Sequence, residues 1–184
     1  MMYASVYPEG SAEGRAIQEG MSYNKEALRL MRLGDYSGAE AQHLRAIQVK
    51  ERGLPKNSNH LSIGISYNGL GEVYILMNRL DDAEHYLLLA IRVRQNGGPA
   101  MDLAMSRDNL GKVYEMRGNL MKAKELRLEG SPDDMICSNF TCTTGIKLPL
   151  NQLSHCGKCK SIFYCSPKCQ KADWKRHKKY CQTQ

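Results

Sequence analysis

The first 136 residues of this 184-residue chain contain no cysteine, although the chain has seven. All seven lie between positions 137 and 181. Acidic residues are also nearly missing from this part of the chain: positions 137–184 hold nine Lys or Arg residues and a single acid, Asp173. Almost all of the net charge of +7 therefore comes from this part, and the residues before it are close to neutral. Cysteine and charge therefore divide the chain at the same place, and the Gly, Ser and Pro at 130–132 indicate a boundary there.

The chain also lacks a long hydrophobic run. Its longest apolar stretch, at 86–91, is far too short to span a bilayer. The first residues show no basic segment followed by an apolar one, so they do not resemble a signal peptide. We therefore expect no membrane segment and a location in the cytoplasm and/or nucleus, where thiols stay reduced.

The cysteine-free part contains a repeat. Residues 22–47 align without a gap with residues 66–91; both segments begin with Ser-Tyr-Asn and end with Ala-Ile. A third, partial copy begins at residues 107–126. Apolar residues follow a helical period within each copy, with a break at Asn78 and Arg79 in the second. Each copy is thus predicted to form two antiparallel helices joined by a short turn, and the copies to stack into an array.

The pattern of these copies resembles the tetratricopeptide repeat. Small residues recur where paired helices must approach closely, at Ala27, Gly71 and Gly111 and at Ala39, Ala83 and Ala123. The signature positions of the second copy are Tyr67, Leu70, Gly71, Tyr74, Ala83, Leu87 and Ala90. The resemblance implies an all-α solenoid of about three helix pairs that binds peptides or helices. The repeat units are longer than is usual for this family, as they are in kinesin light chains. The alternative to a repeat array is an all-α bundle whose similarity to the repeat is accidental.

Two copies depart from this signature. The first has Glu26 where the second has Leu70. The third loses the pattern after Ala123, with Arg127 and Gly130 where Leu and Ala are expected.

The seven cysteines and one histidine form four closely spaced pairs. These are Cys137/Cys142, Cys156/Cys159, Cys165/Cys169 and His177/Cys181. Eight ligands are what two tetrahedral zinc ions require. An odd number of cysteines disfavours a disulfide framework, iron–sulfur proteins use a different spacing, and a catalytic thiol would need a cysteine outside the set. We therefore predict two Zn²⁺ ions per chain, which supply folding free energy to a segment with few large apolar residues.

Local signals place part of this segment on helices. Ser166 followed by Pro167 is typical of a helix start. Residues 171–180 are predicted to form a second short helix.

The cysteine spacing and the segment YCSPKCQKADWKRH (164–177) closely resemble the MYND-type zinc finger. The first cysteine pair is more widely spaced than is usual in that family. The family binds its two zinc ions in an interleaved manner. The resemblance therefore implies that Cys137, Cys142, Cys165 and Cys169 hold one ion and that Cys156, Cys159, His177 and Cys181 hold the other. A sequential assignment of the pairs is the alternative.

The finger resemblance also implies protein binding. MYND fingers bind short proline-containing peptides, and they carry a Gln and a Trp at positions matching Gln170 and Trp174. The alternative for Trp174 is that it fills the small core between the zinc sites. MYND fingers accompany SET-type lysine methyltransferases too, but the rest of this chain is repeats, so we expect no enzyme.

These signals together predict a zinc-binding protein-interaction adaptor. A nucleic-acid-associated regulator that uses the basic residues of the finger is the alternative. The expected organisation is a disordered segment at 1–14, helical repeats at 15–129, a linker at 130–136, the finger at 137–181 and a tail at 182–184.

Overall fold

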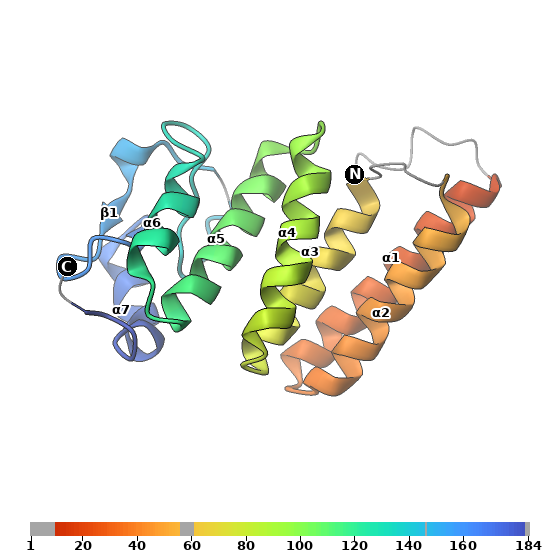
Figure 1. Cartoon of the computed structure of the whole chain (residues 1–184), viewed down its shortest axis with the longest axis horizontal. Helices are drawn as coiled ribbons and strands as arrows, with labels where there is room; N and C mark the ends of the chain where they lie inside the picture. Colours follow the sequence, from red (N-terminus) through yellow and green to blue (C-terminus); the bar gives the residue numbers. More distant parts are fainter. Residues whose placement is uncertain (1–9, 56–60, 146, 183–184) are drawn as a thin grey trace. The chain divides into compact units, whose positions relative to one another are not determined.

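The structure is a computed structural model that describes residues 10–55, 61–145 and 147–182 (Figure 1). The chain divides into two compact units, residues 1–98 and 99–184. None of the described helices is both long and apolar enough to cross a membrane.

The first unit consists of two helix pairs that follow one another in space as in sequence (Figure 1). They are α1 (Ala12–Arg32) with α2 (Tyr36–Gly53), and α3 (Leu61–Leu76) with α4 (Leu80–Gln95). Helix α2 also packs on α3, which joins the pairs into one array. The predicted all-α helical repeat is thereby confirmed.

The turn inside each helix pair uses the same backbone conformation in all three copies. Gly34, Asn78 and Gly118 occupy equivalent positions and have φ angles of 80°, 58° and 82°. Glycine adopts this left-handed region without steric cost and asparagine at a small one. The next residue is the N-cap of the second helix. In the first and third copies the side chains of these caps, Asp35 and Asn119, accept hydrogen bonds from the backbone N–H groups of Gly38 and Lys122. The break predicted at Asn78 is therefore a turn through a left-handed residue, and Arg79 after it makes no capping bond with its side chain.

The contact positions between paired helices are as small as the sequence indicates. Ala27, Ala39 and Val73 are fully buried and form one cluster. A Cβ atom on Gly71 would lie 2.6 Å from the side chain of Leu87, so a larger residue would push the two helices of the second pair apart.

A lysine crosses the interior of the first unit. Lys50 is fully buried, and its Nζ donates to the carbonyl oxygen of Ser62 at 2.7 Å and to Ser66 Oγ at 3.0 Å. Gly20 leaves space for it, since a Cβ there would lie 2.5 Å from Lys50 Cε. Burial lowers the pKa of Lys50 from 10.5 to about 8, because it disfavours the charged form.

The second unit joins a third helix pair to a small irregular domain. Helices α5 (Ala100–Met116) and α6 (Leu120–Leu128) form the pair. The elements after them are a 3₁₀ turn, η1 (Leu150–Gln152), the strands β1 (Ser154–His155) and β2 (Phe163–Tyr164), and α7 (Pro167–His177). The strands pair antiparallel, with Ser154 opposite Tyr164. The sequence did not predict this hairpin.

Several predicted boundaries need correction. The two short helices expected around Ser166 and 171–180 are one helix, α7, because nothing between them interrupts the hydrogen-bonding pattern. Helix α1 begins at Ala12, inside the segment 1–14 that was expected to be disordered; residues 1–9 lie outside the described part, as do 183–184 of the expected tail.

The expected linker at 130–136 is packed rather than free. Met135 is 2% exposed, and its backbone exchanges hydrogen bonds with Leu148 at 3.2 and 2.8 Å. The compact units instead divide between Gly98 and Pro99, so the third helix pair belongs with the finger and not with the other two pairs. The contacts described below give the physical reason.

Candidate metal centre

The eight predicted ligands lie on loops, on one hairpin and at both ends of one helix. Cys137 and Cys142 lie on the loop after α6. Cys156 and Cys159 follow β1, and Cys165 follows β2. The remaining three are Cys169 in the first turn of α7, His177 at its last residue and Cys181 beyond it.

Four of these sulfur atoms form the first group. The Sγ atoms of Cys137, Cys142, Cys165 and Cys169 all lie within 4.8 Å of one another. The distance from Cys142 to Cys165 is 3.7 Å and that from Cys165 to Cys169 is 3.5 Å. A tetrahedral zinc ion with Zn–S bonds of about 2.3 Å requires sulfur atoms about 3.8 Å apart, whereas a disulfide requires about 2.05 Å. The group therefore fits a metal ion and not a disulfide.

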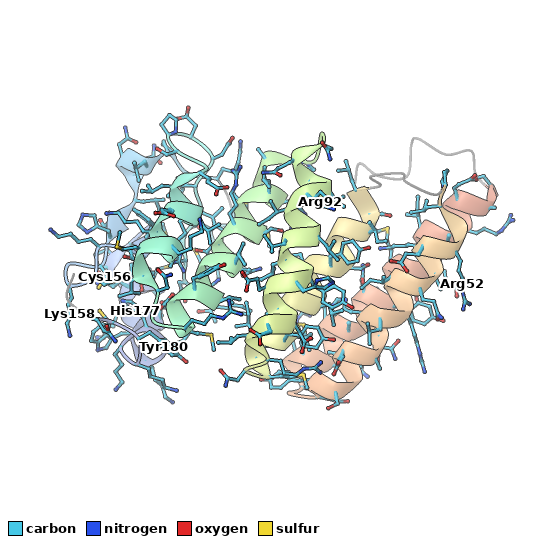
Figure 2. The ribbon with its side chains drawn as sticks, in the orientation of Figure 1. Arg52, Arg92, Cys156, Lys158, His177 and Tyr180 are labelled. Atoms are coloured by element: carbon cyan, nitrogen blue, oxygen red, sulfur yellow. The ribbon has the colours of Figure 1, made fainter. Side chains whose placement is uncertain are left out.

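The second group is more buried than the first. Cys156, Cys159, His177 and Cys181 are all buried, and their ligand atoms also lie within 4.8 Å of one another. Two of them, Cys156 and His177, are labelled in Figure 2. Sγ of Cys156 and Sγ of Cys181 are 3.8 Å apart, and Sγ of Cys159 lies 3.5 Å from His177 Nε2. With Zn–N bonds of about 2.05 Å, tetrahedral geometry places a nitrogen about 3.5 Å from each sulfur. The donor set and its spacing fit a second zinc ion.

The ligand pairs alternate between the two groups along the chain. The pair Cys137/Cys142 meets Cys165/Cys169, and the pair between them in sequence meets His177/Cys181. This is the interleaved arrangement that the family resemblance implies. Helix α7 contributes to both groups, with Cys169 at one end and His177 at the other.

Hydrogen bonds lower the pKa of a thiol in each group, Cys142 in the first and Cys156 in the second. Burial raises the pKa of Cys142, but hydrogen bonds from Thr144 outweigh this and lower it to about 7. Burial likewise opposes ionisation of Cys156, yet the backbone N–H groups of Cys159 and Lys158 lower its pKa to about 7. In contrast, burial raises the pKa of Cys181 to about 12. Zinc binds thiolates, so zinc binding to the second group, which contains Cys181, must release protons from its thiols.

A carboxylate from the third helix pair orients the histidine. His177 Nδ1 lies 2.7 Å from Glu115 Oε1. An ionised carboxylate can only accept, so Nδ1 carries the proton and Nε2 keeps its lone pair for the metal. Burial raises the pKa of Glu115, but the hydrogen bond from His177 and the charges of Arg127 and Arg176 outweigh this and lower it to about 2. The sequence analysis did not identify Glu115. The repeat alignment could have indicated it, because Glu115 is an acidic residue at the position where the second copy has the apolar Ile75.

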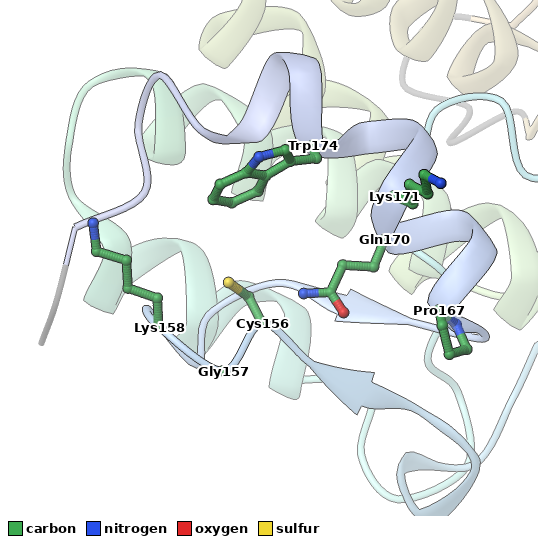
Figure 3. Close-up of a pocket in the computed structure, with 7 residues that line it drawn as sticks. All are labelled: Cys156, Gly157, Lys158, Pro167, Gln170, Lys171 and Trp174. Atoms are coloured by element: carbon green, nitrogen blue, oxygen red, sulfur yellow. The ribbon is translucent and has the colours of Figure 1, made fainter.

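The two predicted peptide-contact residues line one hollow beside the second group. Gln170 and Trp174 project from α7 on the side that faces the segment Cys156–Lys158 (Figure 3). The hollow has a volume of about 430 Å³, and its other lining residues are Pro167 and Lys171. Sequence reasoning did not include Lys158, Pro167 and Lys171, which lie on two separate segments.

Trp174 does not occupy the core. It is 42% exposed, and its ring meets the His177 ring edge-on at 5.9 Å. The aromatic residue that fills the space near the zinc ligands is Tyr164, which is fully buried and donates its hydroxyl to Asp173 at 2.9 Å. The core alternative for Trp174 therefore does not fit.

Comparison with known proteins agrees with both halves of this description. A family model for the tetratricopeptide repeat matches residues 20–60 and 65–96, and the MYND finger model matches residues 137–181. The crystal structure of BtubC (BKLC) from P. vanneervenii is similar, with a TM-score of 0.53 and 26% identity over 58% of this chain and 43% of that one.

Curated relatives match only a short stretch. N-lysine methyltransferase SMYD2-A of Xenopus laevis is 62% identical over 31 residues, and SMYD2 of Homo sapiens is 59% identical over 29. These stretches are 17% and 16% of this chain, and the chain spans 7% of the length of either relative. The chain thus carries tetratricopeptide repeats followed by a MYND finger with sites for two zinc ions, and this combination marks it as a zinc-binding protein-interaction module.

Proposed function

We propose that the chain is an adaptor whose finger binds a proline-containing peptide in the hollow beside Trp174, while the helical repeats hold another protein. It acts by binding rather than by catalysis, in the cytoplasm and/or nucleus. Similarity to the lysine methyltransferases is confined to about 30 residues of the finger, so it supports a shared binding surface and not a shared reaction.

The observation that carries the peptide proposal is the exposure of Trp174 at an apolar hollow. An exposed indole is a flat apolar platform for proline rings, and a proline-rich segment has little conformational entropy left to lose on binding. Gln170 lies on the same helix four residues away and lines the same hollow. Its amide can donate to and accept from the peptide backbone, which fixes the register of the bound segment.

The rim of the hollow favours a peptide that also carries acidic residues. Lys158 and Lys171 line it, and both are exposed. The one acid among residues 137–184, Asp173, is buried and held by both ends of the Arg176 guanidinium at 2.7 Å, so it does not offset the lysines at the surface. Positive potential at an otherwise apolar site attracts an acidic partner and makes its association rate depend on salt.

A second hollow, of about 480 Å³, supports the other half of the proposal. It lies within the first unit and is lined by residues of α2, α3 and α4, among them Leu44, Tyr67 and Tyr86. The Tyr67 and Tyr86 rings lie 6.0 Å apart, which gives it an aromatic wall. Aromatic and aliphatic side chains with an open polar edge are typical of surfaces that bind protein segments.

The peptide proposal is tested with the fluorescence of Trp174, because this is the chain's only tryptophan. The full zinc-loaded chain is titrated with short peptides that contain proline and acidic residues, and with versions in which alanine replaces proline. We expect an emission change and saturable binding for the first set only. Calorimetry then compares Trp174→Ala with Phe140→Ala, an exposed aromatic of the finger at 43% exposure that does not line the hollow.

The expected result is loss of peptide binding in Trp174→Ala and normal binding in Phe140→Ala, with two zinc ions retained in both. A Trp174→Ala protein that is zinc-loaded and binds the peptides with unchanged affinity would overturn the platform role. Salt-dependent binding to unrelated duplex DNA, without binding to any peptide, would favour the nucleic-acid alternative instead.

A further inference from the structure

At three positions, the third helix pair has a buried charged residue where the second pair has an uncharged one. Asp108 and Glu115 on α5 and Arg127 on α6 are all buried. At the 40-residue offset between these copies, the second pair has Asn68, Ile75 and Leu87. A buried charge is costly unless it is paired and hydrogen-bonded. The charges of the third pair therefore require partners, and several of these partners belong to the finger.

Glu115 is the centre of this network. Its Oε1 accepts from His177 Nδ1 at 2.7 Å and from Arg176 Nη1 at 2.9 Å. Its Oε2 accepts from Arg127 Nη2 at 3.2 Å. One fully buried carboxylate on a repeat helix thus binds a predicted zinc ligand and the residue next to that ligand.

Arg127 and Asp108 extend the network to the other loops of the finger. Arg127 donates from Nε to Asp108 Oδ1 at 2.8 Å and from Nη1 to the carbonyl oxygen of Ser161 at 3.2 Å. Asp108 also accepts from Ser138 Oγ at 2.6 Å. Ser138 follows the ligand Cys137, and Ser161 lies two residues after Cys159, so these bonds hold loops of both zinc groups.

Packing agrees with the polar contacts. A Cβ on Gly111 would lie 3.0 Å from Arg127 Cζ, so this glycine makes room for the guanidinium as Gly71 makes room for Leu87. Leu120 of α6 belongs to the same buried cluster as Cys137, Cys156 and Cys181. The arginine that departs from the repeat signature is therefore a contact to the finger.

We propose that Glu115 is a positioning residue of the second zinc site and that it makes α5–α6 and the finger one zinc-dependent folding unit, residues 99–184. A carboxylate on the free nitrogen of a zinc-bound histidine fixes its tautomer and ring orientation. Zinc binding energy is folding energy in small metal domains, and here the bond to Glu115 extends it to the last helix pair.

The first test compares two buried carboxylates of the same helix. Glu115→Gln removes the anion that faces His177. Asp108→Asn removes one that contacts Lys112, Arg127 and Ser138 but none of the predicted ligands. Zinc affinity is measured in the full chain by competition with a chromophoric chelator, and cobalt(II) replaces zinc to give an absorption spectrum of the histidine-containing site. Glu115→Gln should weaken one of the two sites about 10- to 100-fold and shift its cobalt spectrum. Asp108→Asn should leave that spectrum unchanged.

Equal losses of zinc affinity in the two variants, or an unchanged cobalt spectrum in Glu115→Gln, would overturn the positioning role. If Glu115→Gln does not fold, Glu115→Asp serves the same comparison, because it keeps the charge but draws the carboxylate away from His177 Nδ1. The unmodified chain tests the folding unit independently. Removal of zinc by a chelator should reduce amide protection in α5–α6 together with the finger and spare α1–α4, and unchanged protection in α5–α6 would overturn the coupling.

Discussion

The second and third helix pairs have the same backbone arrangement, but different kinds of side chain are buried between their helices. Both turn at a left-handed residue, Asn78 or Gly118, and both place a glycine where the helices approach. The glycine of the second pair faces a leucine, and that of the third faces Arg127. The difference shows that a repeat which departs from its signature need not be degenerate. Its unusual residues are the ones that join it to a neighbour of another kind.

The largest effect is expected from a zinc ligand. Cys165→Ser removes one sulfur from the first group, so zinc content should fall to one ion per chain. A structural zinc ion contributes on the order of 10 kcal/mol, which this small domain cannot replace. Because the groups are interleaved, the loop Cys137–Cys142 should lose amide protection along with α7. Ser138 would then release Asp108, and α5 should lose protection while α3 keeps it.

Metal analysis and site-resolved amide exchange measure this outcome. A change confined to α7, with unchanged protection around Cys137, would contradict the interleaved arrangement. Ser154→Ala, an exposed residue of β1 outside both groups, is the matched control and should retain two zinc ions.

A smaller effect is expected when the third pair is made to resemble the second. Arg127→Leu removes the shared partner of Asp108 and Glu115 and should cost about 3 kcal/mol of unfolding free energy, since partly unpaired buried charges remain. The reverse change, Leu87→Arg, should cost a similar amount because it buries an unpaired cation. Met121→Gln, on an exposed face of α6, should change stability by less than about 0.5 kcal/mol. Urea unfolding measures all three.

A variant with four changes separates stability from metal positioning. Asp108→Asn, Glu115→Ile and Arg127→Leu give the third pair the residues of the second at these positions, and Lys112→Met removes the buried cation that pairs with Asp108 at 2.7 Å. Replacing a buried ion cluster by uncharged residues is often neutral, so stability should exceed that of Arg127→Leu alone. The second zinc site should nevertheless remain weakened, because His177 has lost its carboxylate. Full zinc affinity in this variant would show that the two helix pairs are interchangeable.

The pH dependence of stability distinguishes a buried cation with charged partners from one without. Lys50 is held by the uncharged oxygen atoms of Ser62 and Ser66, and its pKa falls from 10.5 to about 8 on folding. Between these two pH values the unfolded chain binds more protons than the folded chain, so raising the pH through this window stabilises the fold. The gain should be about 3 kcal/mol relative to Lys50→Met, which lacks the titrating group.

Amide exchange in α2 and α3 of the full chain, measured from pH 7 to pH 10.5, reports this gain. The comparison with Lys50→Met cancels the ionisation of tyrosines, which acts in the opposite direction. Parallel pH profiles for the two proteins would mean that folding does not lower the pKa of Lys50.

The smallest effect concerns helix caps. Asn119 caps α6, whereas Arg79 at the equivalent position before α4 makes no capping bond with its side chain. Asn119→Ala should destabilise the short helix α6 by about 1 kcal/mol. Replacing Asn96, which follows α4, by alanine removes one bond to the Arg92 carbonyl oxygen and should cost less. Urea midpoints that rank the two variants in the reverse order would contradict this assignment of the caps.

Features encoded locally were predictable, and features that depend on distant contacts were not. Periodic apolar residues and the small residues at Gly71 and Ala83 predict the helix pairs, because helix formation and close packing depend on neighbours in sequence. Cysteine spacing likewise predicts two groups of zinc ligands. The bond between Glu115 and His177 joins residues 62 positions apart, and no local pattern encodes it. The β1–β2 hairpin is two residues long on each strand and too short to show a period.

Helix α7 carries a ligand of one zinc group in its first turn and a ligand of the other at its last residue, with Gln170 and Trp174 between them. A helix of 11 residues is marginal by itself, but metal bonds at both ends hold it at fixed length and orientation. Its exposed face is therefore rigid before any ligand arrives. A molecule that binds there would bear almost the whole entropic cost of association itself, so a stiff ligand should bind to this surface more tightly than a flexible one of the same chemistry.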